Sequence, residues 1–235
     1  MDGEWMAVLG GSRGIGLAAA KRALARGAEV VIGARGAHDL ERARTAFPKL
    51  RTAVCDVTDR DSLAAFFSGL PRLDHLFYAA GAFSPGGVRD GDLALARAGL
   101  ETRVWGAACA IRAALPKLAP NGTITLTGGV STDRPAPGAW SVSVGTAAAE
   151  QMARALALEL APIRVNAIAP GWTDTPMWDA ILGAAKTQTF AEIGAKTLVG
   201  RIATADEIAD AALFLMNNRS VTGEVVHVDG GLRLA

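Results

Sequence analysis

The sequence predicts a single-domain α/β fold of the doubly wound type, a parallel sheet flanked by helices on both faces. Three observations support it. Short apolar runs alternate with helix-like segments, the runs lack polar alternation, and a glycine cluster at 10–16 separates the first run from the first helical segment. Strands buried on both faces have this continuous apolar character, and parallel strands need a crossover, usually a helix, between them.

The first unit begins with an apolar strand over Trp5 to Leu9, followed by a helical segment over Ile15 to Arg26. Gly27 is expected to end that helix, because glycine tolerates the left-handed conformation that commonly follows a helix. The second strand is expected over 28–34. The later elements repeat the pattern: strand 52–55 and a helix near 62–67, strand 74–80 and a long helix inside 93–118, strand 123–127 and a helix near 146–160, and strand 164–169.

Composition limits the function classes. The 235 residues include 24 Lys and Arg against 23 Asp and Glu, and half are apolar, which is typical of a globular domain with a substantial core. A net charge of +1 gives no basic field for nucleic acid or a membrane surface, so we expect a small-molecule partner. Cys55 and Cys109 form no CxxC pair, so no metal site is expected.

The chain starts with acidic residues where a secretion signal needs positive charge, and no uncharged run approaches the ~20 apolar residues of a membrane helix. We therefore expect a cytoplasmic protein. No linker or composition break divides the chain, so residues 1–235 are expected to form one domain. The irregular stretch at about 170–200 follows a strand and is a candidate lid over the substrate. The alternative is a surface excursion that packs on a neighbouring subunit.

The glycine cluster predicts that this domain binds a dinucleotide. A tight turn between a strand and a helix brings backbone N–H groups and the positive end of the helix against a pyrophosphate, where larger side chains would collide with the phosphates. A glycine-rich loop alone is weak support, but the order strand, loop, helix, strand is typical of a Rossmann-like fold. The cofactor contacts expected in this loop are Gly10, Ser12, Arg13, Gly14, Ile15 and Gly16.

The end of the second strand predicts which cofactor binds. A carboxylate about 20 residues after the glycine loop binds a ribose 2′-hydroxyl, whereas an arginine accommodates a 2′-phosphate. The strand ends at Ala34-Arg35 without a carboxylate, so Arg35, helped by Arg13, favours NADP(H) through charge-assisted hydrogen bonds. The alternative is that Arg35 is only a solvated residue at a strand end.

Motifs along the whole chain resemble those of the short-chain dehydrogenase/reductase family. Residues 9–16 match its glycine motif except for the first threonine. Residues 78–81 keep the Ala-Gly of its Asn-Asn-Ala-Gly motif but lose both asparagines, and residues 164–171 resemble the strand and Pro-Gly turn beside the nicotinamide. Segment 55–58 resembles its adenine-contacting Asp-Val, and 228–231 its last strand. The resemblance implies a homo-oligomer, a tetramer or a dimer. It also implies further cofactor contacts at Asp56, Val57, Ala80, Gly81, Pro170, Gly171, Thr173 and Thr175.

The family's catalytic residues have no counterpart in the sequence. The family uses a tyrosine in Tyr-x-x-x-Lys, an upstream serine and a helix asparagine, whereas Tyr78 is the only tyrosine here and Ala82 follows it four residues later. Counting back from the well-matched segment 156–160 and from Gly106 places the four family positions at Gly129, Val142, Thr146 and Arg103. We therefore expect an atypical active site.

Arg103 is the first candidate to replace these residues, because a permanently charged guanidinium can hold a substrate carboxylate or stabilise a developing alkoxide. The alternative is an exposed helix arginine. Ser141 and Thr146 are tentative candidates to pass or anchor a proton, although small hydroxyl residues at a helix start commonly cap it. The other polar residues expected near the nicotinamide are Ser131, Asp133 and Ser143.

The remaining candidates are aromatic. Trp105, Trp140, Trp172 and Trp178 are expected to line an apolar pocket for a flat hydrophobic substrate. For Trp105 the alternative is a core or subunit-contact role. The histidines are expected to be structural or solvated rather than catalytic: His38, His75 and His227.

These observations predict an enzyme, an NADP(H)-dependent oxidoreductase that reduces a carbonyl or imine of a small hydrophobic substrate by a non-standard proton-delivery route. General acid catalysis contributes about 10²–10⁴ in rate, so hydride transfer can survive its loss. The alternative is a non-redox enzyme or a catalytically inert NADP(H)-binding protein on the same fold, since all four catalytic positions are replaced at once.

Overall fold

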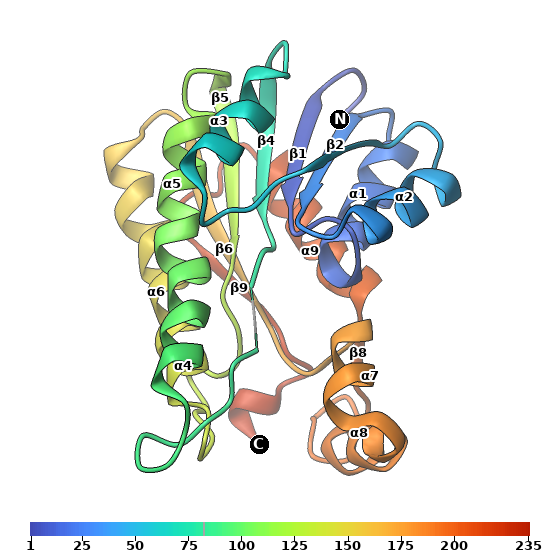
Figure 1. Cartoon of the computed structure of the whole chain (residues 1–235), viewed down its shortest axis with the longest axis vertical. Coiled ribbons are helices and arrows are strands. Elements are labelled where there is room, and N and C mark those ends of the chain that lie inside the picture. Colours follow the sequence, from blue (N-terminus) through green and yellow to red (C-terminus); the bar gives the residue numbers. More distant parts are fainter. Residues whose placement is uncertain (82) are drawn as a thin grey trace.

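The structure, a computed structural model, describes residues 1–81 and 83–235 and confirms the doubly wound α/β fold (Figure 1). In the described part of the chain, seven parallel strands form one sheet in the order β3-β2-β1-β4-β5-β6-β9. The strand order changes direction between β1 and β4, and such folds bind ligands there, at the carboxyl ends of the strands. The strands are β1 (Trp5–Leu9), β2 (Glu29–Ala34), β3 (Arg51–Val54), β4 (Leu73–Tyr78), β5 (Leu118–Thr127), β6 (Arg164–Pro170) and β9 (Val225–Val228).

Helices cover both faces of this sheet (Figure 1). One face is packed by α1 (Gly14–Ala25), α2 (Ala37–Ala46) and α9 (Ala205–Asn217), and the other by α3 (Arg60–Ser68), α5 (Gly106–Ala114) and α6 (Trp140–Glu159). Helix α4 (Leu93–Leu100) packs on α6 and leads towards α5.

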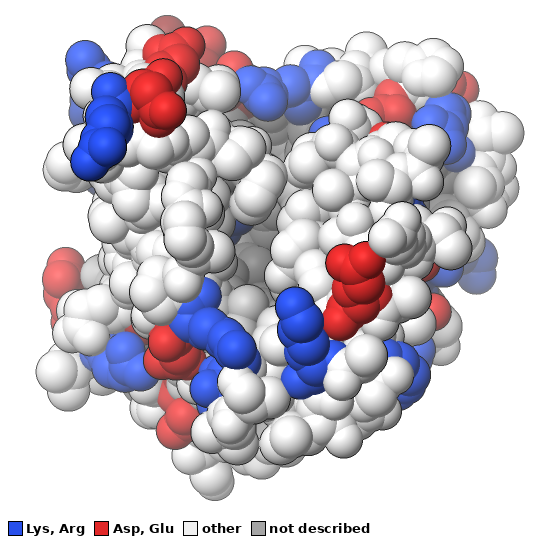
Figure 2. All heavy atoms as spheres, turned by 90° about the horizontal axis from the view of Figure 1, so that it is seen from below, with Lys and Arg blue, Asp and Glu red and all other residues white. Residues whose placement is uncertain are grey.

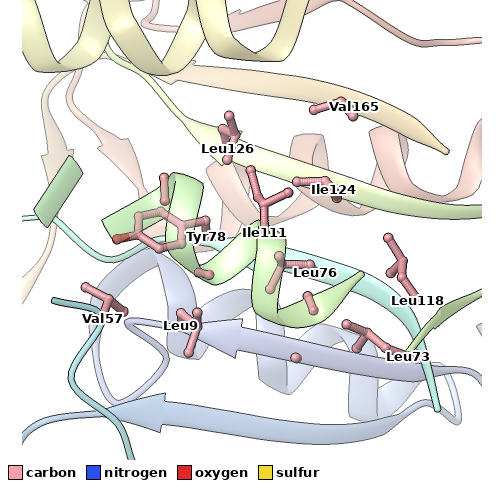
Figure 3. Close-up of a cluster of buried hydrophobic side chains, with 14 of the residues drawn as sticks. Leu9, Val57, Leu73, Leu76, Tyr78, Ile111, Leu118, Ile124, Leu126 and Val165 are labelled. Atoms are coloured by element: carbon pink, nitrogen blue, oxygen red, sulfur yellow. The ribbon is translucent and has the colours of Figure 1, made fainter. Parts of the chain in front are cut away.

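Each strand contributes to two cores, because successive side chains of a strand point to opposite faces of the sheet. In β1, Ala7 and Leu9 belong to the core under α3, α5 and α6, while Met6 and Val8 belong to the core under α1 and α9. Figure 3 shows side chains of the first core, among them Leu9 and Tyr78. Burial on both faces explains the continuous apolar runs in the sequence.

The long helix expected inside 93–118 is interrupted. Between α4 and α5, Glu101–Trp105 form a π-turn, η1, in which hydrogen bonds span five residues rather than four. Side chains occupy two carbonyls at this turn: the Tyr78 hydroxyl donates to the Thr102 carbonyl at 2.6 Å, and the Thr102 hydroxyl donates to the Ala98 carbonyl at 3.1 Å. Single π-turns inside α-helices frequently occur at functional sites.

Other helices also differ from the prediction. Helix α6 begins at Trp140 rather than near Thr146, and it continues through Gly145, a residue that weakens the helical pattern in the sequence. Helix α2 is mostly polar and was not predicted. Helix α9 was not predicted either, although Thr204 and Glu207 form a capping box at its start.

The segment expected to form a lid lies at the carboxyl end of the sheet and is largely helical (Figure 1). The Lys186 ammonium joins its parts through ion pairs at 2.8 Å to Asp174 and 2.7 Å to Asp179. The parts are β7 (Thr173–Asp174), α7 (Pro176–Leu182), the 3₁₀ turn η2 (Gly183–Ala185), α8 (Lys186–Gly194) and β8 (Ala203–Thr204), with β7 and β8 paired in a small separate sheet.

Two kinds of feature are absent from residues 1–81 and 83–235. No helix there combines the length and the apolar character needed to cross a membrane. The same residues contain no group of three or more His, Cys, Asp or Glu side chains placed to hold a metal ion.

Candidate active site

The loop between β1 and α1 packs directly against the end of β4, which explains its glycines. Gly10 has φ +83°, and a Cβ atom at this position would lie 2.6 Å from the Ala80 nitrogen. A Cβ atom at Gly16 would lie 2.3 Å from the Gly10 carbonyl oxygen. Neither position has room for a side chain, so glycine at both lets the loop pack against the end of β4 and against the start of α1.

The start of α1 suits an anionic ligand. Its N-cap residue, Arg13, makes no capping hydrogen bond with its side chain, and the first turn contains no acidic residue. Gly14 has φ +55° and lies beside Thr175, whose Cγ2 would be 3.4 Å from a Cβ atom on Gly14. Ser12 and Ile15 are partly exposed on the same loop. Uncapped N–H groups and the helix dipole stabilise a diphosphate at such a position, so these residues fit a dinucleotide.

Two arginines lie where the adenosine end of the dinucleotide is expected. Arg35 at the end of β2 and Arg13 are both exposed, and no ion pair involves either of them within the described residues. The Asp56 carboxylate accepts hydrogen bonds from the Thr58 N–H at 2.9 Å and hydroxyl at 2.8 Å. These bonds, together with the charge of Arg35, hold the pKa of Asp56 below its usual range. The neighbouring Val57 is buried.

The residues expected beside the nicotinamide come together at the carboxyl ends of β5 and β6. The Val130 N–H donates to the Pro170 carbonyl at 2.8 Å, and the Gly171 N–H donates to the Val228 carbonyl at 3.0 Å. Thr173 is buried, and its hydroxyl donates to the Gly171 carbonyl at 3.0 Å, so this hydroxyl stabilises the turn itself.

Arg103 lies in the middle of the π-turn, and its side chain reaches the carboxyl ends of β4 and β5. A Cβ atom on Gly81 would lie 2.9 Å from the guanidinium carbon, and one on Gly145 would lie 2.8 Å from the Arg103 Cδ. One guanidinium nitrogen lies 3.5 Å from the Thr127 carbonyl oxygen, the length of a weak hydrogen bond. Glycine at both flanking positions therefore makes room for this side chain.

The charge of Arg103 is poorly compensated. Its Nε atom is buried without a hydrogen-bond partner, and within the described residues no carboxylate forms an ion pair with it. Burial lowers the pKa of the guanidinium, which nevertheless stays protonated because the ordinary pKa of an arginine is about 12 or higher. The side chain is turned towards the sheet, unlike an exposed helix arginine, and it can attract a negative or developing negative charge.

Tyr78 is a core residue rather than a surface acid (Figure 3). Its hydroxyl donates to the Thr102 carbonyl at 2.6 Å, and a Cβ atom on Gly106 would lie 2.7 Å from the hydroxyl oxygen of Tyr78. Burial raises the pKa of the phenol far above its ordinary range. The only tyrosine of the chain is thus held neutral and supports the π-turn.

Ser141 and Thr146 lie on α6, and both are buried. The Ser141 hydroxyl donates to the Ser84 carbonyl at 3.0 Å, and the Thr146 hydroxyl donates to the Ser143 carbonyl at 3.0 Å. The Thr146 methyl group packs near Gly129, where a Cβ atom would be 3.1 Å away. The structure therefore places Thr146 beside Gly129, with its own hydroxyl proton donated to the backbone.

Glu150 is a buried carboxylate that the sequence interpretation did not single out. One of its oxygens accepts from the Gly129 N–H at 3.2 Å and from the Thr132 hydroxyl at 2.7 Å, so it holds the loop after β5. A Cβ atom on Gly128 would lie 2.5 Å from that oxygen. The available signal was its spacing, because Glu150 follows Thr146 by one helical turn and shares its face of α6.

The same loop is tied to the C-terminal segment. His227 lies 2.9 Å from the Asp133 carboxylate, and the Arg134 guanidinium donates to the carbonyls of Leu232 and Ala235. These contacts fit the structural role expected for His227. The other histidines lie elsewhere: His38 is exposed on α2, and His75 is buried in β4.

The carboxyl end of the sheet is hollowed. Figure 2 views the molecule from that end and shows a deep cleft between two lobes, the left one towards α4 and the right one towards α7 and α8. In the segment expected to form a lid, Trp172 and Trp178 stack with ring centroids 4.0 Å apart, and Phe190 packs edge-on to both. Phe83, which follows β4 in the chain, has its ring centroid 5.4 Å from that of Trp178.

Only part of the expected aromatic lining is found there. Trp105 is 64% exposed on the helix surface, which contradicts the pocket expectation and fits its alternative as a contact residue. Trp140 begins α6, and its indole nitrogen is buried without a partner. Phe83 and Phe190 were not predicted, because only the tertiary structure brings them to the tryptophans.

Comparisons with known proteins agree with this geometry. The family described as enoyl-(acyl carrier protein) reductase matches residues 10–233. The cis-4-hydroxycyclohexanecarboxylate dehydrogenase of Sinomonas cyclohexanicum is 34% identical over 95% of this chain and 94% of its own length. The structure of the MalC reductase/Diels-Alderase of Malbranchea aurantiaca has a TM-score of 0.93 at 25% identity, covering 100% of this chain and 98% of that one.

A solved small-chain dehydrogenase in complex with NADPH is also similar, with a TM-score of 0.87 at 31% identity and coverage of 100% of both chains. The matching family covers nearly all of the sequence, and the sheet order and glycine loop agree with it. The chain therefore belongs to the short-chain dehydrogenase/reductase family of oxidoreductases.

Proposed function

We propose that this chain is an NADP(H)-dependent reductase that acts on a carbonyl or imine of a small hydrophobic substrate without a tyrosine acid. The observation that carries the proposal is Arg103. Its inward-turned guanidinium lies against Gly81 at the carboxyl ends of β4 and β5, with no carboxylate partner in the described part of the chain. A cation at this position would meet the substrate atom that gains electrons.

The cofactor site in this proposal follows the strand ends. The uncapped start of α1 would hold the diphosphate, and the exposed guanidiniums of Arg13 and Arg35 would bind a 2′-phosphate. NADPH, when bound, supplies the hydride. The other proposed contacts are Gly10, Ser12, Gly14, Ile15, Gly16, Asp56, Val57, Ala80, Gly81, Pro170, Gly171, Thr173 and Thr175.

Arg103 would act by charge stabilisation rather than by proton transfer. Its guanidinium polarises the carbonyl or imine and stabilises the negative charge that develops on the oxygen or nitrogen as the carbon accepts the hydride. Ser141 and Thr146 complete the proposed site, and because their protons are donated to backbone carbonyls, they would serve mainly to fix its walls. The proton would then come from solvent or from a hydroxyl of the substrate.

The test is oxidation of NADPH in the presence of ketones, quinones and imines, followed in the steady state and in a single turnover. Arg103→Ala should lower kcat and kcat/KM together by about 10²-fold, because the charge it stabilises develops only in the transition state. Arg112→Ala, an exposed arginine on α5, is the matched control and should behave like wild type. If NADPH binds but no acceptor is reduced, the chain is not a reductase.

A non-redox activity is the second candidate, as an enzyme or as an inert NADP(H)-binding protein. It is favoured by the engagement of the Tyr78 hydroxyl with the Thr102 carbonyl. A similar structure is described as a reductase/Diels-Alderase, so this fold also supports bond formation without net redox change. Substrate conversion without NADPH consumption would support this candidate.

We also propose that the protein is a cytoplasmic homo-oligomer, a dimer or a tetramer. Two apolar side chains on the outer helices support self-association, since Trp105 is 64% exposed and Val144 on α6 is 49% exposed. A second copy covering them would bury both.

A further inference from the structure

Three aromatic rings of the lid form a preorganised platform. Trp172, which follows β6, and Trp178 of α7 stack at 4.0 Å with an angle of 10° between their planes. Phe190 of α8 meets them edge-on, at 6.4 Å and 89° and at 6.5 Å and 81°. Offset stacking and edge-to-face contact are the arrangements that aromatic rings prefer, so these three rings stabilise one another.

Phe83 meets this platform differently. It comes from a different segment, the one that follows β4, and its ring lies 5.4 Å from Trp178 at 55°, which is neither a stacked nor an edge-on arrangement. Trp178 is nevertheless buried, while Phe83 is only partly so. The contact between Phe83 and Trp178 can therefore open while the platform stays intact.

The polar end of the cleft lies close to Phe83 along the chain. Gly81, two residues before Phe83, packs against the Arg103 guanidinium. Cα atoms two residues apart lie at most roughly 7 Å from each other, so the backbone that carries Phe83 starts close to that charge. Ser84 is buried, and the Ser141 hydroxyl donates to its carbonyl at 3.0 Å, so this wall is anchored to α6.

We propose that the substrate carries a planar aromatic ring that inserts between Phe83 and Trp178, with its carbonyl or imine a few bonds away and directed to Arg103. The inference rests on the proposed function, since it names the substrate class of that site. A flat ring can stack on the platform and replace the poorly aligned contact with Phe83. A saturated ring of the same size is thicker and offers no π-face, so it stacks poorly.

The experiment compares two methyl ketones whose carbonyl is separated from a six-membered ring by two CH₂ groups, benzylacetone with an aromatic ring and its cyclohexyl analogue with a saturated one, so that neither carbonyl is conjugated with its ring. Their binding to the NADP⁺ complex is measured by calorimetry, and their reduction by NADPH oxidation. Wild type should prefer benzylacetone at least tenfold in both measurements. Phe83→Leu and Trp178→Leu should each reduce the preference to less than threefold, whereas Phe214→Leu, the same change on the outer face of α9, should leave it intact.

Two failures remain distinguishable. If neither ketone is reduced, the proposed reductase function fails, and the calorimetric preference still decides the aromatic site. If both ketones bind equally, or if Phe83→Leu retains the preference, the aromatic site is refuted even in an active reductase. Phe83→Leu decides the question should Trp178→Leu fail to fold, because Phe83 lies at the edge of the cluster.

Discussion

Replacing Arg103 by methionine should stabilise the fold while it impairs the reaction. The Arg103 Nε atom is buried without a partner, and its contact with the Thr127 carbonyl is long at 3.5 Å. An unsatisfied buried donor costs about 1–3 kcal/mol. Methionine keeps the packing of the stem against Gly145 and removes the charge. We expect a net gain of about 1 kcal/mol, or about 2–4 °C in Tm for a chain of 235 residues.

The assay combines thermal unfolding of the cofactor-free protein, followed by circular dichroism, with single-turnover oxidation of NADPH. The expected signature is a higher Tm together with a rate lowered by about 10²–10³-fold, because functional groups held in place for the transition state commonly reduce stability. Arg112→Met is the control, and as an exposed substitution it should stay within about 0.5 kcal/mol of wild type.

A fall in Tm would refute this reasoning. It would mean that the guanidinium supports the strand ends and the π-turn by contacts that outweigh its desolvation. Arg103→Lys then separates charge from shape, since lysine carries the charge but cannot reproduce the planar fork of the guanidinium.

Four other outcomes are expected. NADPH should bind at least tenfold tighter than NADH in calorimetry, a difference of about 1.4 kcal/mol. Arg35→Ala should abolish this preference for NADPH, and a preference for NADH that survives this change would reject the NADP(H) assignment. Tyr78→Phe should lower the free energy of unfolding by about 1 kcal/mol in denaturant titration, because it removes the hydrogen bond to the Thr102 carbonyl. The variant should retain single-turnover activity, and an inactive variant would restore a phenolic mechanism. The hydrogen bond from Arg201 lowers the pKa of Glu207 from 4.5 to about 2, so the stability it adds is present above pH 4.5 and is lost as the pH falls towards 2. The Tm values of wild type and Glu207→Gln should converge over that range, and a constant difference would contradict the linkage. Light scattering at micromolar concentration should give the mass of a dimer or tetramer rather than a monomer.

The sequence was sufficient for most of the sheet and for the glycine loop after the first strand, because both depend on local patterns. Continuous apolar runs such as Trp5 to Leu9 predict strands buried on both faces, and the structure has most of them within two residues of the expected bounds. The exceptions are β5, which begins at Leu118 rather than at 123, and β9, which lies at Val225–Val228 rather than at 228–231. The glycines at 10 and 16 were predicted to prevent collisions with a pyrophosphate, whereas the structure gives a different reason for them, because a Cβ atom at either position would collide with the backbone of the chain itself.

The details of the candidate site could not be predicted, because they depend on contacts between distant segments. The π-turn relies on the bond from Tyr78 to Thr102, which nothing in the helix pattern indicates. Arg103 could be identified as a candidate by counting back along the sequence from Gly106. The inward direction of its side chain could not, because it depends on the space left by Gly81 and Gly145. Glu150 was missed because a helix glutamate is normally solvated, and its burial is made tolerable by the loop groups that donate to it.

The π-turn also fixes the register between α4 and α5. A single deleted residue within 101–105 would close the turn into regular helix and rotate everything after it by roughly 100° relative to α4. The apolar face of α5, with Ala107, Ala110 and Ile111, would then leave the sheet, unless α4 rotated instead and carried Arg103 away from Gly81. The chain can therefore pack α5 and hold Arg103 at the carboxyl ends of β4 and β5 only while it keeps this one extra residue, so a length change at 101–105 should be tolerated far less than a substitution there.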